Sequence, residues 1–301
     1  MFRRLFVPLD GSPLAESALP AAVELAKRLG ARITLFHALE RSAPTTIHGE
    51  RHLTEEREAE RYLDEVSSWV ARSGIQVETR IETPSGDVAA AIAAGAGSTG
   101  ADLVVLCRHG AGGVRAMLYG RVAQQVLQRG HVPVLLLQPT PAGREQPFRC
   151  RRIMVPFDGS ATAEVALPAA SALSTAFGAE MVFVLVVPTL ETMAGERAAS
   201  ARLMPTAAAT VLEAEAAAAR EYLTSLAVRT GGGARPEVSV ERGEPVRVLL
   251  EAAASRGIDL IVMATHGRSG VSAVWAGSVA ARLLGHTTTP VLLVRIPEHP
   301  S

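Results

Sequence analysis

The chain has 301 residues, with 30 basic and 30 acidic side chains, 48% hydrophobic residues and two cysteines. This length is enough for about two domains, each with a core of its own. A net charge of zero, balanced in each half, argues against a protein that binds nucleic acid or a membrane surface, because both partners require a basic face.

Strands and helices are expected to alternate along the chain. In the first half, short apolar runs rich in β-branched residues predict buried strands at residues 5–9, 32–39, 76–81, 103–107 and 132–137. Longer stretches with helical periodicity, such as 55–71 and 206–228, are typical of the helices between strands. This alternation predicts a doubly wound α/β fold, a parallel sheet with helices on both faces. Ligands in such folds bind beyond the carboxyl ends of the strands.

An internal repeat divides the chain. Residues 7–12 read VPLDGS and residues 155–160 read VPFDGS, while ADLVVL at 101–106 returns as IDLIVM at 258–263. A period of about 150 residues is too long for a solenoid unit and indicates a duplicated domain. We therefore predict domains at residues 1–140 and 150–297. The proline-rich, polar segment 141–149 between them is expected to be an exposed linker.

The first candidate site is the Asp-Gly-Ser turn after the first strand of each repeat, with Asp10 and Asp158. Glycine permits a sharp exit from the strand, and serine can cap the next helix. Neither role requires an aspartate at the end of a strand, where a carboxylate faces the ligand crevice. Turn formation and ligand contact are equally good explanations of the aspartate on residue type alone.

The second candidate is the loop Ala264–Gly270, followed by Gly277 and Ser278 at the expected start of a helix. Glycines let a phosphate approach the backbone, and a helix start offers free N–H groups and a favourable dipole. An ordinary glycine-rich loop with Ser278 as a helix cap explains the same residues equally well.

These residues together resemble the universal stress proteins, over nearly the whole chain. Family members that bind ATP carry Gly-x2-Gly-x9-Gly-Ser/Thr after the fourth strand. The second repeat matches with Ala264-x2-Gly267-x9-Gly277-Ser278, in which only the first glycine is replaced. The resemblance implies two tandem five-stranded parallel sheets of the adenine-nucleotide α-hydrolase type. It also implies a pseudo-dimer, in which the strands at 132–137 and 291–294 pair at their edges.

The resemblance further implies ATP as the ligand, with Mg²⁺ as a candidate companion, and assigns roles in the second repeat. Gly267, Gly277 and Ser278 would hold the phosphates, Asp158 would face the nucleoside, and the backbone near Val187 would meet the adenine. The remaining candidate positions around the phosphates are Ala264, His266, Arg268, Gly270 and Val279.

The first repeat departs from this pattern, because its matching segment is Cys107-x2-Gly110-x9-Gly120-Arg121. It lacks the first glycine, and Arg121 stands where the phosphate-facing hydroxyl should be. Our hypothesis is that this degenerate site, with Asp10 at its turn, has lost ATP binding and serves structure or regulation. Redox sensing by Cys107 is a weaker alternative, since a cysteine that ends a buried strand is usually inert.

The leading functional hypothesis is a stress-response protein that regulates through its ATP-bound state, with at most slow ATP hydrolysis. The alternative is an interaction module of the same family that acts through a protein partner without nucleotide. An adenylyl-transferring or hydrolytic enzyme would require a catalytic loop that is not evident. The expected location is the cytoplasm, since no apolar run reaches the ~18 residues of a membrane span. A homodimer of the whole chain is left open.

Overall fold

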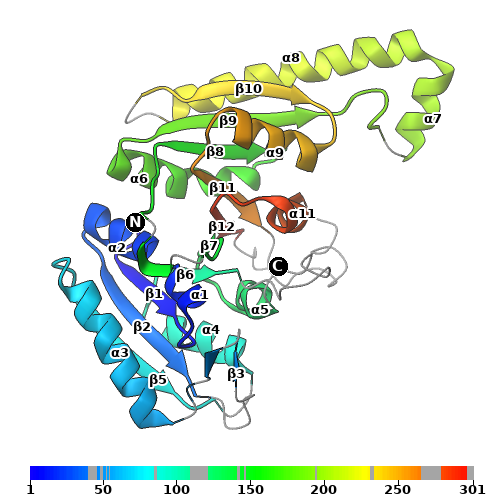
Figure 1. Cartoon of the computed structure of the whole chain (residues 1–301). Coiled ribbons are helices and arrows are strands. Elements are labelled where there is room, and N and C mark those ends of the chain that lie inside the picture. The colour runs from blue at the N-terminus through cyan, green and yellow to red at the C-terminus, as the bar shows by residue number, and fades with distance from the viewer. Residues whose placement is uncertain are drawn as a thin grey trace. The chain divides into compact units, whose positions relative to one another are not determined.

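The structure is a computed structural model of the chain. It describes residues 1–39, 46–47, 50–51, 53, 55–84, 87–108, 121–140, 143–145, 147–193, 195–230, 234–265 and 279–296. Contacts within the chain separate two compact units (Figure 1). Among the described residues, unit 1 takes in Met1–Arg149 and 290–296, and unit 2 takes in Cys150–Thr265 and 279–289.

The sheet of unit 1 has the strand order β5-β2-β1-β6-β7-β12. Its first five members run parallel, and β12 pairs antiparallel with β7, with Leu292 opposite Leu135. The central strands are buried along most of their length, as their continuous apolar runs require. The strands are β1 (Arg4–Pro8), β2 (Arg32–Ala38), β5 (Val77–Glu82), β6 (Leu103–Cys107), β7 (Val134–Leu137) and β12 (Val291–Arg295).

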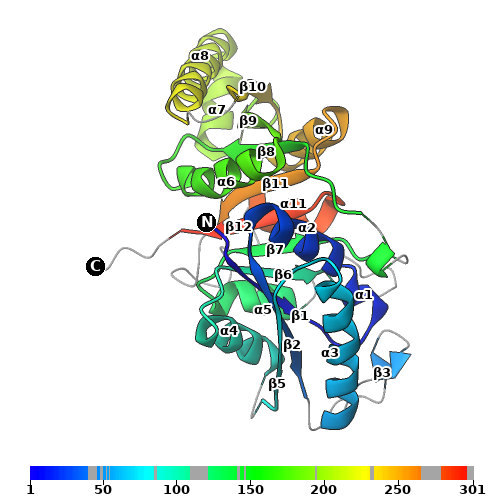
Figure 2. The ribbon, with the colours of Figure 1, turned by 90° about the vertical axis from the view of Figure 1, so that its left-hand side faces the viewer.

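Helices cover both faces of this sheet. Helices α2 and α3 lie on one face and α4 and α5 on the other (Figure 2). The helices of unit 1 are α1 (Pro13–Glu16), α2 (Leu19–Leu29), α3 (Glu56–Ala71), α4 (Val88–Ser98) and α5 (Arg121–Arg129). A short hairpin, β3 (Thr46–Ile47) with β4 (Glu50–Arg51), precedes α3, and the 3₁₀ turn η1 (Gly143–Glu145) follows β7.

Unit 2 repeats the arrangement with the parallel strand order β10-β9-β8-β11. Helices α6 and α8 lie on one face of its sheet, and α9 and α11 lie on the other (Figure 2). The strands are β8 (Arg152–Phe157), β9 (Glu180–Val187), β10 (Glu237–Arg242) and β11 (Leu260–Thr265). The helical elements are η2 (Ala163–Ala166), α6 (Leu167–Phe177), α7 (Gly195–Leu203), α8 (Pro205–Arg229), α9 (Pro245–Ser255) and α11 (Val279–His286).

The predicted fold class, a mostly parallel α/β sheet between layers of helices, is confirmed. The two units do not divide simply at the linker. Strand β12 groups with unit 1, although it closes the second sequence repeat. The boundaries at 1–140 and 150–297, and the pseudo-dimer packing, stay predictions.

Gly95 shows how closely α4 approaches the sheet of unit 1. A Cβ at this position would lie 3.0 Å from Cζ of Phe6 and 3.2 Å from Cε2 of Phe36. These two rings pack in a tilted arrangement at a centroid distance of 5.0 Å and are fully buried. Glycine is therefore used here for close packing, at a cost in helix propensity.

We predict that Gly95→Val lowers the free energy of unfolding by about 1–3 kcal/mol, because the added methyls overpack the contact with Phe6 and Phe36. The matched control is Gly97→Val in the same helix, where no described atom lies within 4 Å of the new Cβ. It should be neutral or stabilising, since valine is a better helix former than glycine. Urea unfolding of both variants measures the difference, and equal destabilisation would contradict the packing argument.

Candidate functional site

The turn at the carboxyl end of β8, where the sequence predicts the ligand crevice of unit 2, is organised by one aspartate. Oδ1 of Asp158 accepts hydrogen bonds from the N–H of Ser160 at 2.9 Å and from its hydroxyl at 2.6 Å. The same serine hydroxyl accepts the N–H of Ala163 at 3.3 Å. Gly159, which lies between Asp158 and Ser160, has a φ of +84°. Asp158 is exposed, and the hydrogen bonds that it accepts from described residues all end on Oδ1. Its other oxygen can therefore accept hydrogen bonds from a ligand.

Unit 1 builds the same turn around Asp10. Its Oδ1 accepts the N–H of Ser12 at 2.9 Å, the hydroxyl of Ser12 caps α1 at Ala15, and Gly11 has a φ of +87°. For Asp158, turn formation and ligand contact are therefore not exclusive explanations, since one oxygen is sufficient to hold the turn.

The two turns differ in what lies against the glycine. A Cβ on Gly11 would lie 2.8 Å from Cδ1 of Leu53, so this leucine covers the turn of unit 1. At Gly159 no described atom lies within 4 Å of the corresponding position. The turn glycine is thus covered by a side chain of the chain itself in unit 1, and no described atom lies against it in unit 2.

His37 lies between the end of β1 and Leu53. It is buried on β2, with Nδ1 2.8 Å from the carbonyl oxygen of Leu9 and Nε2 3.4 Å from that of Leu53. A neutral imidazole has a single N–H and can donate to only one of these carbonyls, and the shorter distance indicates that Leu9 is the acceptor. When the repeats are aligned on Asp10 and Asp158, the position of His37 is taken by the buried Leu185, which has no polar side-chain atom.

A tyrosine–glutamate pair lies beside the crevice in both units and was not singled out in the sequence. In unit 2 the hydroxyl of Tyr222 donates to Oε1 of Glu164 at 3.1 Å. Burial, the nearby Glu164 and, more weakly, Asp158 raise the pKa of Tyr222. In unit 1, burial followed by Glu16 raises the pKa of Tyr62 in the same way. Both tyrosines are held as neutral phenols next to the aspartate turn.

The repeat itself carried a signal for this pair. Tyr-Leu occurs at 62–63 and again at 222–223, and Ala-Glu at 15–16 and again at 163–164. Since Tyr222 and Glu164 belong to elements far apart in sequence, only the recurrence of both dipeptides could have linked them.

In unit 1 the linker joins this cluster. Arg144 in η1 forms two hydrogen bonds with Glu16, at 2.6 and 2.9 Å, and approaches Glu65 at 3.2 Å. The side chains of Arg144 and Glu16 are only 21% and 12% exposed. Thr140 adds a hydrogen bond from its N–H to the hydroxyl of Ser17 at 3.1 Å. The segment expected to be exposed is therefore fastened to α1 and α3 at this point.

The other predicted residues fall into two groups. Val187 ends β9 and accepts the N–H of Gly243 at 3.0 Å, Ala264 lies within β11 rather than after it, and Val279 begins α11. Arg121 begins α5, with its side chain outside the described part. The following predicted positions lie outside the described residues altogether: Gly110, Gly120, His266, Gly267, Arg268, Gly270, Gly277 and Ser278.

Both cysteines are buried thiols. Burial, followed by Asp10, raises the pKa of Cys107 to about 12, and burial, followed by Asp259, raises that of Cys150 to about 12. The thiolate is the reactive form of cysteine, so neither residue is poised for redox chemistry at neutral pH.

A sequence profile described as the universal stress protein family matches residues 1–138 and again 149–295. The chain belongs to the universal stress protein family. It carries the family's domain twice, in tandem, as the resemblance implied.

Relatives and solved structures agree with this membership. The chain is 26% identical over 317 residues to a universal stress protein of Mycolicibacterium smegmatis, covering 97% of this chain and 96% of the relative. It is 29% identical over 150 residues to universal stress protein YxiE of Bacillus subtilis, covering 46% of this chain and all of the relative. The crystal structure of a universal stress protein from Archaeoglobus fulgidus matches with a TM-score of 0.69 and 19% identity, covering 98% of each chain.

Two kinds of feature are absent from the described residues. No helix among them is both long and apolar enough to span a membrane. They also contain no group of three or more His, Cys, Asp or Glu side chains placed to hold a metal ion.

We predict that Arg144→Met lowers the free energy of unfolding by about 1–3 kcal/mol, because it leaves the nearly buried Glu16 without its cation. The double variant Glu16→Gln/Arg144→Met should recover part of this loss. Arg197→Met is the control, since its ion pair with Glu215 is largely exposed and should contribute less than ~1 kcal/mol. Similar losses for Arg144→Met and Arg197→Met in chemical denaturation would count against a buried ion pair.

We also predict that neither cysteine of the native protein reacts readily with a disulfide reagent such as DTNB at pH 8. Unfolding in guanidinium should release both thiols, since their pKa values then return to the ordinary range. The absorbance of the released thiolate follows the reaction, and rapid labelling of one thiol in the native protein would show an accessible cysteine.

Proposed function

We propose that this universal stress protein binds ATP, mainly in its second repeat, and regulates a stress response through its nucleotide-bound state. The observation that carries the proposal is the difference between the two aspartate turns. Asp158 and Gly159 are exposed at the end of β8, whereas Leu53 covers Gly11 in unit 1. A nucleoside needs this space beside the aspartate, and unit 1 fills it with its own side chain.

Each part of the nucleotide has candidate partners in the second repeat. The free oxygen of Asp158 would accept hydrogen bonds from ribose hydroxyls, and the end of β9 near Val187 would meet the base. The motif Ala264-x2-Gly267-x9-Gly277-Ser278 retains two of its three glycines and the hydroxyl. Backbone N–H groups at a helix start are well suited to phosphates. Mg²⁺ would accompany the ATP as the counter-ion of its phosphates.

Regulation rather than rapid catalysis fits the side chains next to the crevice. Tyr222 stays protonated, and Glu164 is engaged by Tyr222 and by Arg229, at 3.1 and 3.3 Å. Neither group is free to act as a general base on a bound phosphate. ATP hydrolysis is therefore expected to be slow, and bound ATP would act by changing the conformations that the protein populates.

A second candidate function, an interaction module without nucleotide, is favoured by one surface feature. Leu203 ends α7 and Met204 joins it to α8, and the two residues are 84% and 66% exposed. Large exposed apolar side chains that lie together are typical of protein contact sites. A partner protein that binds here equally well with and without ATP would favour this alternative.

We predict that ATP at millimolar concentration raises the melting temperature, because a ligand specific for the native state stabilises it by mass action. Mass spectrometry of small molecules released from the purified protein should detect adenine nucleotide in the wild type and lose it in Ser278→Ala. A wild type that is empty and is not stabilised by added ATP would reject the proposal.

The aspartate pair provides matched variants for locating the site. We predict that Asp158→Ala weakens ATP binding in calorimetry about tenfold or more, as expected for lost hydrogen bonds to a charged group. Asp10→Ala removes the same turn bond in unit 1 and should leave the affinity unchanged. The reverse pattern would place the nucleotide in unit 1, and equal losses would show that the turns act through stability alone.

A further inference from the structure

An ion pair joins two helices that lie on the same face of the sheet in unit 2. Nη2 of Arg282, in α11, donates to Oε1 of Glu244 at 2.7 Å, and Glu244 is the residue immediately before α9. The two side chains are 47% and 34% exposed, so the pair contributes little to stability. Its location indicates a different role, because each partner lies next to a different part of the predicted nucleotide site.

Glu244 belongs to a turn that is attached to the end of β9. The N–H of Gly243 donates to the carbonyl oxygen of Val187 at 3.0 Å, and the backbone near Val187 is the predicted contact of the base. Oε2 of Glu244 accepts the N–H of Arg247 at 2.8 Å and so caps α9. The carboxylate that binds Arg282 is therefore fixed to the base end of the predicted site.

Arg282 lies at the other end of this site, close to the predicted phosphate motif. It is the fourth residue of α11, and Gly277 and Ser278 of the motif directly precede this helix in the chain. Helical side chains lean toward the amino terminus, so the side chain of Arg282 extends toward the start of α11. The ion pair thus attaches the start of this helix to the turn that carries Glu244.

The pair adds a directional contact to a helix that is otherwise packed by apolar residues. Ala280, Leu283 and Leu284 are the side chains that α11 buries together with Ala281. Apolar contacts are non-directional, so they hold a helix against its neighbours without fixing its exact position. A short hydrogen bond between a guanidinium and a carboxylate does fix the relative position of the two groups.

Unit 1 retains the acid but has its cation at a different place. Asp87 corresponds to Glu244, caps α4 and pairs with Arg129, which is the last residue of α5. At the position of Arg282, unit 1 has Gln125. The helix after the degenerate motif is therefore attached at its end, and the helix after the near-intact motif is attached close to its start, where phosphates would bind.

The charges of the pair favour positioning over direct attraction of phosphate. The N–H of Arg247 and, more weakly, the guanidinium of Arg282 lower the pKa of Glu244, which is therefore ionised at neutral pH. The pair then carries no net charge. Its effect on a bound nucleotide would come from where it holds the start of α11.

We propose that Glu244 and Arg282 are positioning residues of the nucleotide site, which hold the start of α11 in place relative to the base-binding end of β9. This inference rests on the proposed function. A nucleotide with a polyphosphate has to contact both ends at once, whereas adenosine occupies only the base and ribose part. A site that is already in the right arrangement binds more tightly, so the pair favours ATP over adenosine.

Positioning and charge attraction give opposite expectations for Glu244→Gln. This variant keeps an oxygen that can cap α9, breaks the ion pair and makes the region more positive by one charge. We expect it to weaken ATP binding in calorimetry about fivefold or more and to change adenosine binding by less than about twofold. Tighter binding of ATP, or an equal loss for adenosine, would overturn the proposal.

Further variants separate the ion pair from general effects of charge. Arg282→Gln, which installs the residue of unit 1, should weaken ATP binding to a similar extent, and the double variant Glu244→Gln/Arg282→Gln should be no weaker than either single variant. A double variant that regains the affinity of the wild type would reduce the effect to local charge and overturn the proposal.

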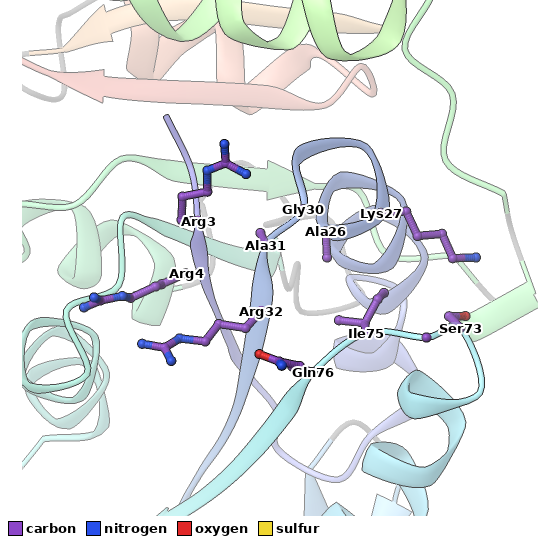
Figure 3. Close-up of a pocket in the computed structure, with 11 residues that line it drawn as sticks. Arg3, Arg4, Ala26, Lys27, Gly30, Ala31, Arg32, Ser73, Ile75 and Gln76 are labelled. Carbon is purple, nitrogen blue, oxygen red and sulfur yellow. The ribbon is translucent and has the colours of Figure 1, made fainter.

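Two control variants lie in unit 1. Arg129→Gln breaks the corresponding ion pair, and Arg32→Gln removes an equal charge at the amino end of the sheet, where Figure 3 shows Lys27 extending away from Arg32. Both should bind ATP like the wild type, and a loss equal to that of Arg282→Gln would contradict a role specific to the ion pair in unit 2.

The same titrations distinguish this inference from the function on which it rests. A wild type that binds no ATP would overturn both. A wild type that binds ATP, with unchanged affinity in Glu244→Gln and Arg282→Gln, would overturn the positioning role alone.

Discussion

One carboxylate oxygen closes the turn after the first strand in each repeat, and the position of the crevice depends on that bond. Asp10 and Asp158 each bind the N–H of the serine two residues later, while the glycine between them adopts a positive φ. The sheets are covered by helices on both faces, so polar chemistry is confined to the ends of the strands. A change in what surrounds this turn alters the site without disturbing the core.

The two repeats have diverged at strand ends rather than in the sheet. At the carboxyl end of β1, Leu53 lies over Gly11 in unit 1, beside the buried His37, and the position of His37 is taken in unit 2 by Leu185, an ordinary core residue. At the opposite end, Lys27 and Arg32 replace Thr175 and Glu180. Each change affects one or two side chains on an unchanged backbone plan.

The sequence was sufficient for the elements whose local pattern decides their structure. The strand predicted at 103–107 has the same bounds in β6, and the helices predicted at 55–71 and 206–228 differ from α3 and α8 by at most one residue at each end. Continuous apolar runs and long helical periods are local signals, so the secondary structure of these segments could be predicted without knowledge of distant contacts.

The parts of the site that depend on contacts between distant segments could not be predicted. Leu53 comes from the connection between β2 and α3, which has no periodic pattern, and meets Gly11 only after folding. Arg144 lies in a segment whose composition favours exposure, yet its guanidinium is held by Glu16 from α1. Aspartate turns could be found from a motif, but the side chains that cover or open them could not.

The pairing of β12 with β7 has a consequence for synthesis. Unit 1 takes its last strand from residues 291–295, so its sheet is incomplete when residue 140 has been made. At ribosomal speeds the apolar edge of β7 waits on the order of ten to thirty seconds for its partner. During that interval the nascent chain presents Val134 and Leu136 on an open edge, which is a template for pairing with other chains. Slow translation of the second half would therefore increase the need for a chaperone that protects the first.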